Sequence, residues 1–285
     1  MEQYTMKYKV KQYLMFAGVS TVLFSAVVIL PFIYGLYLTF TSWDGVSKDK
    51  PFVGLANYIA TFQDAAYWQA LGRTLIYSVI AVILVNVVAF FLAYLLTSGI
   101  KGQNFFRAGF FVPNLIGGIV LGYIWQLIFN GVLSRYGTAL ALNEWYGFWG
   151  LIILVSWQQI GYMMIIYIAG IQNIPGELIE AAKMDGANSW QLLKKVTIPM
   201  VMPSITICTF LTLTNSFKLF DQNLALTAGE PSNNSQMLAL NIFDTFYGRN
   251  GWEGVGQAKA VIFFIIVAVI ALAQNRLTRS KEVQQ

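Results

Sequence analysis

The sequence predicts an all-α membrane protein with six transmembrane helices, because its composition is strongly apolar and its uncharged runs are long. Hydrophobic residues make up 57% of the 285 residues and charged residues only 11%, and the mean hydropathy is +0.60. A soluble domain carries roughly a quarter charged residues. Crossing the hydrocarbon core of a bilayer takes about 20 helical residues. Five uncharged runs exceed that length and a sixth is shorter, at residues 12–43, 74–100, 108–134, 145–176, 196–217 and 260–275.

The spans are expected in one transmembrane domain covering residues 1–285, at about 14–40, 74–98, 108–129, 149–171, 200–220 and 255–275. An even number of spans puts both termini on the same side of the membrane. If the N-terminus is cytoplasmic, eleven of the 18 Lys and Arg residues fall in inner segments, as is typical of membrane proteins. We therefore expect a multi-pass protein of the cytoplasmic (inner) cell membrane with both termini cytoplasmic. The sixth run is short for a span, but Lys259, just before it, could reach the membrane surface by snorkelling, and the apolar pattern extends back to Val255.

The side chains that the sequence lacks exclude several functions. There is no histidine, and the one cysteine, Cys208, lies inside an uncharged run. Without histidine or paired acids in the spans, metal binding and general acid–base catalysis lack their usual groups. No G-x-x-x-x-G-K-[ST] phosphate loop is present, so ATP hydrolysis would need another subunit. We therefore expect no enzyme activity, no metal and no cofactor. The net charge of +5 is explained by the inner Lys and Arg and implies no nucleic-acid partner.

One long segment is both charged and helix-forming, namely residues 173–199. Pro175 suits a first helical turn, and Gly186 can take the left-handed backbone that ends a helix. A second short helix is expected with a capping-box pair at its start and two lysines closing it, namely Asn188 with Gln191 and then Lys194 with Lys195. By shape alone, the segment is either a helix-turn-helix knob on the cytoplasmic surface or an amphipathic connector that touches only lipid headgroups.

The residues of this segment resemble the EAA loop of bacterial ABC importer permeases. The pattern consists of Glu180-Ala181-Ala182, three residues, Gly186, nine residues, and then Val196-Thr197-Ile198-Pro199, where the family usually has I-x-L-P. The whole chain most resembles sugar-importer subunits related to the larger permease of the maltose system. The resemblance implies an ABC type I importer permease fold with a cytoplasmic coupling helix. The residues at its contact with the ATPase subunit would be Glu180, Ala181, Ala182, Asp185 and Gly186.

The resemblance also implies partners and a substrate. These are a second homologous permease subunit, two ATPase subunits that dock on the coupling helices, an extracellular sugar-binding protein, and a sugar, with an uncharged oligosaccharide as the best candidate. The segment Leu226–Pro231, LTAGEP, is similar to the family's L-T-x-G-G-P loop but has Glu230 at the second Gly. This loop would face the binding protein.

Polar side chains within the apolar runs suggest a substrate site. Trp157 and Tyr162 lie on the fourth run beside Gln158, and aromatic faces with amides suit a sugar. From the residues alone, helix packing or lipid contact of Trp157 is the preferred interpretation. The maltose-type permease has a Trp and a Tyr at this spacing that contact the bound sugar, and this resemblance favours a site. It also implies roles for Asn114, Ser216 and Lys218.

Two expectations concern the remaining runs. Gly118-x-x-x-Gly122 in the third run predicts a close helix contact, and the threonines of the fifth run are expected to bond their own backbone. A glycerol-phosphate-type substrate is the main alternative to a sugar, because related permeases carry it and Lys218 could attract a phosphate. An ion-coupled secondary transporter is a weaker alternative, since it would need ionisable residues near the bilayer midplane and internal repeats, and the sequence shows neither.

Overall fold

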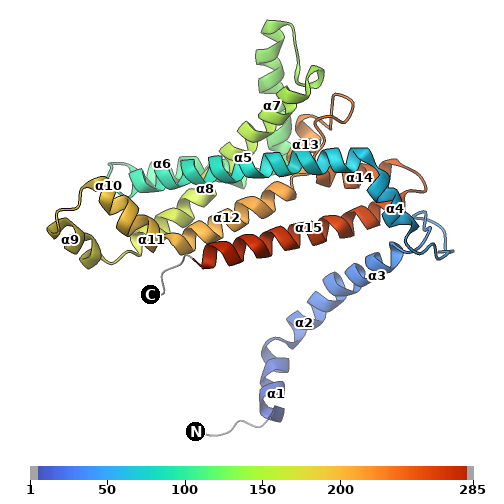
Figure 1. Cartoon of the computed structure of the whole chain (residues 1–285), viewed down its shortest axis with the longest axis horizontal. Helices are drawn as coiled ribbons and strands as arrows, with labels where there is room; N and C mark the ends of the chain where they lie inside the picture. The colour runs from blue at the N-terminus through green and yellow to red at the C-terminus, as the bar shows by residue number, and fades with distance from the viewer. Residues whose placement is uncertain (1–5, 281–285) are drawn as a thin grey trace. The chain divides into compact units, whose positions relative to one another are not determined.

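The computed structural model describes residues 6–280, with side chains from residue 11 onward, and this part of the chain consists of helices joined by loops (Figure 1). Within it, the one β feature is an isolated antiparallel bridge between Thr41 and Phe52. The predicted all-α fold is therefore confirmed. The α-helices are α1 (Met6–Phe16), α2 (Gly18–Phe24), α3 (Leu30–Leu38), α4 (Ala56–Gln63), α5 (Ala65–Leu96), α6 (Gln103–Phe111), α7 (Gly118–Leu133), α8 (Glu144–Gln172), α9 (Gly176–Met184), α10 (Ser189–Leu192), α11 (Ile198–Met200), α12 (Met202–Phe217), α13 (Asp221–Leu226), α14 (Leu238–Gly248) and α15 (Glu253–Arg279).

Four helical segments of the described chain are long and apolar enough to cross a membrane. They are Gly18–Leu38, which joins α2 to α3 through a π-helical turn at Ser25–Ile29, and the helices α5, α8 and α15. These segments overlap the predicted first, second, fourth and sixth spans. Two bent pairs of helices pass the same test, and the total is up to six if each pair is one span.

The two bent pairs contain the predicted third and fifth spans. Gln103–Leu115 and Gly118–Tyr136 meet at 100°, because the backbone is extended at Ile116 and Gly117. Pro113, in the 3-10 turn just before this break, cannot donate the hydrogen bond that would continue a helix. Ser189–Met200 and Met202–Phe217 meet at 68°. The third and fifth spans were predicted from the length of their uncharged runs, and the length of a run does not indicate whether its helix is bent.

The chain divides into two compact units. One comprises the residues up to Asp64 together with Ile242–Ile262, and the other comprises Ala65–Asn241 together with the residues from Phe263 onward. In the first unit, Asn57 on α4 donates hydrogen bonds to the carbonyl oxygens of Thr39 and Thr41, both at 2.8 Å. Gly254 lies so close to this contact that a Cβ there would be 2.7 Å from the Thr41 oxygen.

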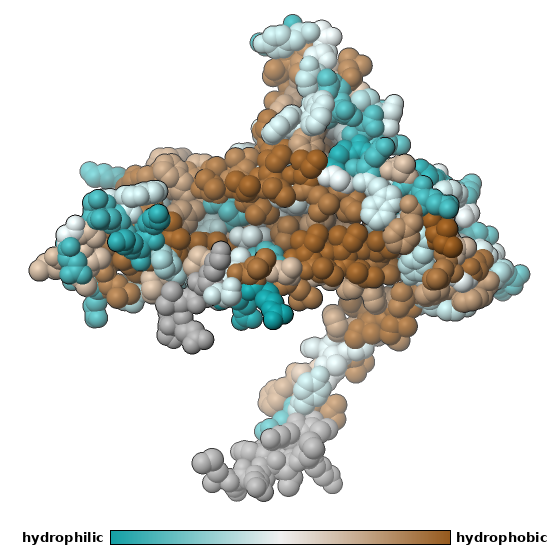
Figure 2. Space-filling model, in the orientation of Figure 1, coloured by the Kyte–Doolittle hydropathy of each residue, from teal (hydrophilic) through white to brown (hydrophobic). Residues whose placement is uncertain are grey.

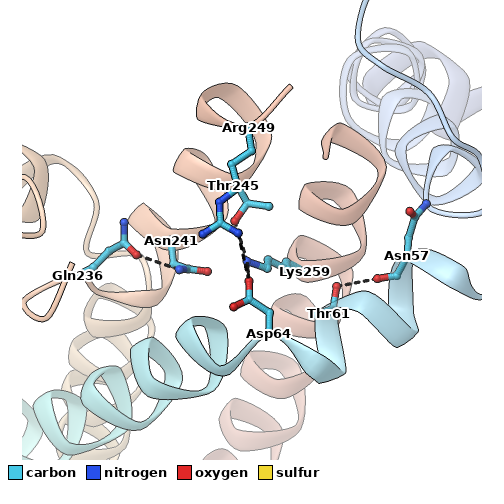
Figure 3. Close-up of polar contacts among 8 residues, drawn as sticks. All are labelled: Asn57, Thr61, Asp64, Gln236, Asn241, Thr245, Arg249 and Lys259. Carbon is cyan, nitrogen blue, oxygen red and sulfur yellow. Dashed lines mark hydrogen bonds and ion pairs between the residues drawn. The ribbon is translucent and has the colours of Figure 1, made fainter. Parts of the chain in front are cut away.

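Lys259 on α15 lies inside this first unit (Figure 3). Its side chain is 0% exposed, and its Nζ donates to Oδ2 of Asp64 and to Oγ1 of Thr245, each at 2.7 Å. Arg249 adds a second, longer ion pair to Asp64 at 3.8 Å. The prediction that Lys259 snorkels to the membrane surface is therefore wrong, because a carboxylate within the same unit satisfies its charge.

The second unit has a core where α5 packs against α8 and α12. Small residues of α5, including Ala81, Ala89 and Ala93, are buried and allow the helices to approach closely. Gly161 of α8 packs directly against the Phe110 carbonyl, where a Cβ has no room, and this contact holds α6 on α8. The opposite side of α5 is apolar and exposed, and Figure 2 shows apolar residues over much of the visible surface along this helix. Such a surface suits contact with lipid.

Candidate functional site

The end of α9 has the backbone geometry that the sequence predicts. Gly186 has φ +79°, and its N–H donates to the Lys183 carbonyl at 3.0 Å. The Ala187 N–H donates to the Ala182 carbonyl, also at 3.0 Å. These two bonds form a Schellman motif, which satisfies the last carbonyls of the helix. Pro175 is the N-cap of α9 and lies one residue before the helix, whereas the sequence placed it inside the first turn.

The second helix of the segment begins with the predicted capping box. The Asn188 side chain accepts from the Gln191 N–H, and the Gln191 side chain accepts from the Asn188 N–H, both at 2.9 Å. The helix does not close at Lys194 and Lys195, as the sequence predicts. It continues through a π-helical turn at Leu193–Thr197 into α11, because nothing at Lys195 breaks the backbone hydrogen-bond pattern.

The predicted coupling residues lie on the surface of this segment. Glu180, Ala181, Asp185 and Gly186 are exposed and Ala182 is partly buried. Two large apolar side chains of the same segment are also exposed, Met184 by 88% and Trp190 by 67%. A charged segment that also presents large apolar side chains has the character of a protein-docking surface.

A polar cavity of about 290 Å³ lies in the second unit. It is formed where the 3-10 turn after α6, α8, the end of α12 and the start of α13 come together. Its lining residues are Asn114, Gln158, Gln159, Asn215, Lys218, Leu219, Asp221 and Gln222. Three of the predicted substrate residues, Asn114, Gln158 and Lys218, are therefore brought together from three separate elements.

Two neighbouring glutamines that line the cavity differ in their hydrogen bonds. Gln158 donates to the Ile116 carbonyl at 3.1 Å and accepts from the Gln222 side chain at 2.8 Å, so it ties α8 to the bend before α7 and to α13. The neighbouring Gln159 has a buried Oε1 with no hydrogen-bond partner among the described residues. A buried acceptor without a partner destabilises the protein until a ligand or water donates to it.

The other predicted substrate residues do not line this cavity. Trp157 is 43% exposed, and its ring packs edge-on against Trp125 with centroids 5.5 Å apart. Tyr162 is 36% exposed. Ser216 is buried, and its Oγ donates to the Thr212 carbonyl of its own helix at 2.7 Å. One step along a helix turns a side chain by about 100°, so Trp157 and Gln158 face different directions.

Five lining residues were outside the predicted set, one of them the apolar Leu219, and a sequence signal existed for two of the polar ones. Gln159 and Asn215 are amides inside uncharged runs, which is the same signal that selected Gln158. Asp221 and Gln222 follow the fifth run and enter the cavity only because α13 packs against α7. The predicted close contact at Gly118 and Gly122 is what allows this packing, since a Cβ at Gly122 would lie 2.5 Å from the Ala225 Cβ.

The loop after α13 is held by one buried amide. Asn223 donates to the Thr227 hydroxyl and to the Ser235 carbonyl, each at 3.0 Å, and accepts from the Met237 N–H at 2.8 Å. The segment Leu226–Pro231 lies within this loop, with Gly229 at φ +87°. Asn223 therefore fixes the loop and α13 together, at the edge of the cavity.

A family model for the inner membrane component of binding-protein-dependent transport systems matches residues 86–283. The chain belongs to this family of ABC transporter permeases, which are pore-forming membrane subunits and not enzymes. It is therefore an integral membrane protein.

Similar proteins come from several organisms. The chain is 48% identical over 266 residues to the probable starch degradation products transport system permease protein AmyD of Thermoanaerobacterium thermosulfurigenes, with 90% of each protein covered. It is 32% identical to the multiple sugar-binding transport system permease protein MsmF of Streptococcus mutans, over 89% of this chain and 90% of that protein. A chain from the crystal structure of a bacterial alginate ABC transporter, in complex with a pentasaccharide-bound periplasmic protein, superposes with a TM-score of 0.81, 18% identity and 98% of each chain covered. This likeness confirms the predicted type I permease fold.

Proposed function

We propose that this chain forms half of the translocation pore of an ATP-driven importer for a sugar, most simply an oligosaccharide delivered by an extracellular binding protein. The observation that carries the proposal is the 48% identity to AmyD, whose name describes transport of starch degradation products. MsmF, named for multiple sugars, adds support at 32% identity. The second half of the pore would be a homologous permease subunit.

The chemistry of the polar cavity fits an uncharged, hydroxyl-rich substrate. Five of its lining residues are amides, and each amide group offers both donors and an acceptor for sugar hydroxyls. The Oε1 of Gln159 is buried and accepts no hydrogen bond from the described residues, so a sugar hydroxyl that reached it would supply its missing donor. Lys218 favours the alternative, a glycerol-phosphate-type substrate, but Asp221 in the same cavity would repel the phosphate.

The coupling segment would connect this pore to ATP hydrolysis on separate subunits. Residues 173–199 carry the EAA pattern, and the exposed Met184 and Trp190 offer apolar surface for a cleft on an ATPase subunit. One copy of the segment on each permease would engage one of two ATPase subunits. Closure of the ATPase pair on ATP would then draw the two segments together and open the cavity outward, and hydrolysis would reset it.

The chain would cross the cytoplasmic membrane six times, with each bent pair counted as one span. Both termini would then be cytoplasmic, in agreement with the distribution of Lys and Arg; residues 1–5 and 281–285 lie outside the described part of the chain. The same orientation places the coupling segment inside the cell and the loop after α13 outside.

Uptake of labelled maltooligosaccharides tests the proposal in a strain that lacks this transporter and receives the complete transporter in its place. We expect uptake that requires the binding protein and the ATPase subunits, and no competition from glycerol phosphate. Import of glycerol phosphate instead would overturn the sugar assignment. Uptake that persists without the ATPase subunits and collapses with the ion gradient would identify a secondary transporter.

A further inference from the structure

A second cavity of about 360 Å³ lies away from the polar cavity, at the amino ends of α5 and α8. Its volume falls in the range of small-ligand pockets, roughly 300–1,000 Å³. Most of its wall is apolar, with Ile76, Phe148 and Trp145 among its lining residues. Phe148 is buried, whereas Ile76 and Trp145 are each more than half exposed, so the cavity is open at the surface of the two helices.

Two opposite charges, Arg73 and Glu144, line this apolar cavity. Both lie in the wall of the same cavity, but the described residues show no ion pair within 4.0 Å between them. Arg73 donates to the Gln69 carbonyl at 3.3 Å and to the Asn233 carbonyl at 3.1 Å. A guanidinium has five N–H donors, so several remain for a ligand. The Glu144 carboxylate accepts no hydrogen bond from the described residues.

This combination restricts the chemistry of an occupant. A free phosphate would be repelled by Glu144, and a simple cation by Arg73. A neutral sugar would neutralise neither charge. A zwitterion with an adjacent phosphate and ammonium satisfies both groups, and a hydrocarbon chain attached to it matches the apolar wall. Trp145 adds the residue type enriched where membranes meet water.

We propose that this cavity binds one zwitterionic phospholipid with a primary amine, of the phosphatidylethanolamine type. Arg73 would bind its phosphate, Glu144 would accept from its ammonium, and one acyl chain would lie along Ile76 and Phe148. The site is independent of the transported substrate. The proposed orientation places the amino ends of α5 and α8 outward, so the lipid would come from the outer leaflet.

The proposed lipid site can be tested by letting two phospholipids compete for binding to the complete purified transporter. The complex is incubated with equal amounts of phosphatidylethanolamine and phosphatidylglycerol that carry the same chains, and the retained lipid is identified by native mass spectrometry. We expect wild type to prefer phosphatidylethanolamine by about tenfold, the value of one charge-assisted hydrogen bond. Glu144→Gln should abolish the preference, Arg73→Lys should keep it, and Arg135→Gln, an exposed cation outside the cavity, should resemble wild type. An unchanged ratio in Glu144→Gln overturns the proposal.

Two further measurements separate lipid from other occupants. Chain-free glycerophosphoethanolamine in excess should not displace the retained lipid, and equal competition would mean that the site takes a soluble ligand. A photo-crosslinking amino acid at Trp145 in native membranes should capture a phospholipid. Capture of the binding protein or of the second permease subunit would show instead that this face is a protein interface, and the lipid proposal would be rejected.

Discussion

The ammonium nitrogen of Lys259 lies 2.7 Å from Oδ2 of Asp64, which is 195 residues earlier in the chain. The lysine side chain is fully buried and that of Asp64 is 11% exposed. The contact joins the amino-terminal half of α15 to Asp64, the residue that ends α4. Because the buried ammonium is stable only with its carboxylate beside it, the effects of replacing Lys259 and Asp64 on the free energy of unfolding should be coupled.

Asp64→Asn should destabilise the protein by about 3–5 kcal/mol, because it leaves the Lys259 charge buried without its carboxylate. The double variant Asp64→Asn with Lys259→Met should lose less than the sum of the single variants. Thermal unfolding of the purified transporter in detergent measures the change. Arg249→Met is the control: its side chain is 43% exposed and 3.8 Å from Asp64, and exposed pairs contribute roughly 0–1 kcal/mol. Equal effects of all three single variants would contradict a central role for the buried pair.

Gly122→Ala should destabilise the contact between α7 and α13, because the new Cβ would lie 2.5 Å from the Ala225 Cβ. Overpacking of this kind costs about 1–3 kcal/mol. Gly131→Ala, on the same helix, meets nothing within 4 Å and should be neutral or stabilising by up to about 1 kcal/mol. Thermal unfolding and sugar uptake report on both variants. Similar behaviour of the two would show that the helices can separate at Gly122 without loss.

Gly186→Ala should reduce coupling between sugar delivery and ATP hydrolysis. At φ +79° a residue with a side chain is strained by about 1 kcal/mol. A Cβ there meets no atom of this chain within 4 Å, so any steric clash would come from the docked ATPase subunit. The measurement is ATPase stimulation of the reconstituted complex by the loaded binding protein. Gly176→Ala, which has equally open surroundings at the start of α9, should retain full stimulation; a loss there as large as at Gly186 would point to general damage of the segment.

Asn114→Leu should lower sugar uptake while the complex still assembles, because it removes an amide from the polar cavity. Trp157→Ala tests the sugar-stacking role that the sequence implies, and loss of one aromatic surface should cost on the order of 1 kcal/mol. Uptake assays with purification of the intact complex as the assembly control measure both. Wild-type uptake in Trp157→Ala would mean that this ring serves only to pack against Trp125.

A reporter inserted near Ser189, or fused after Gln285, should behave as cytoplasmic. A reporter inserted near Ser232, in the loop after α13, should behave as external. Six spans with both termini inside require this pattern. An external signal at Ser189 would remove the coupling segment from the side of the membrane where ATP is hydrolysed.

Local signals in the sequence were sufficient for some features and not for others. The capping box of Asn188 and Gln191 and the left-handed Gly186 depend on residues within one turn of each other, and the structure contains both. The cavity depends on α13, which reaches Asn114 and Gln159 only through the glycine contact on α7. The partner of Lys259 lies far away in the chain, and no local pattern indicates it. The bend at Ile116 and Gly117 was not predicted, because hydropathy shows how apolar a segment is and not the backbone dihedral angles of its residues.

The π-helical turn at Leu193–Thr197 holds one residue more than an α-helix would use over the same rise. The wide turn absorbs this additional residue, so deleting one residue there should restore a regular α-helix and leave the parts before and after it facing the same directions. Deleting one residue at Gln191 or Leu192 of α10 instead would turn everything before the deletion, Trp190 included, by about 100° around the helix axis relative to α11. The same change of length would therefore be silent in the wide turn, whereas in α10 it would alter which partner surface the coupling segment meets without replacing any EAA residue.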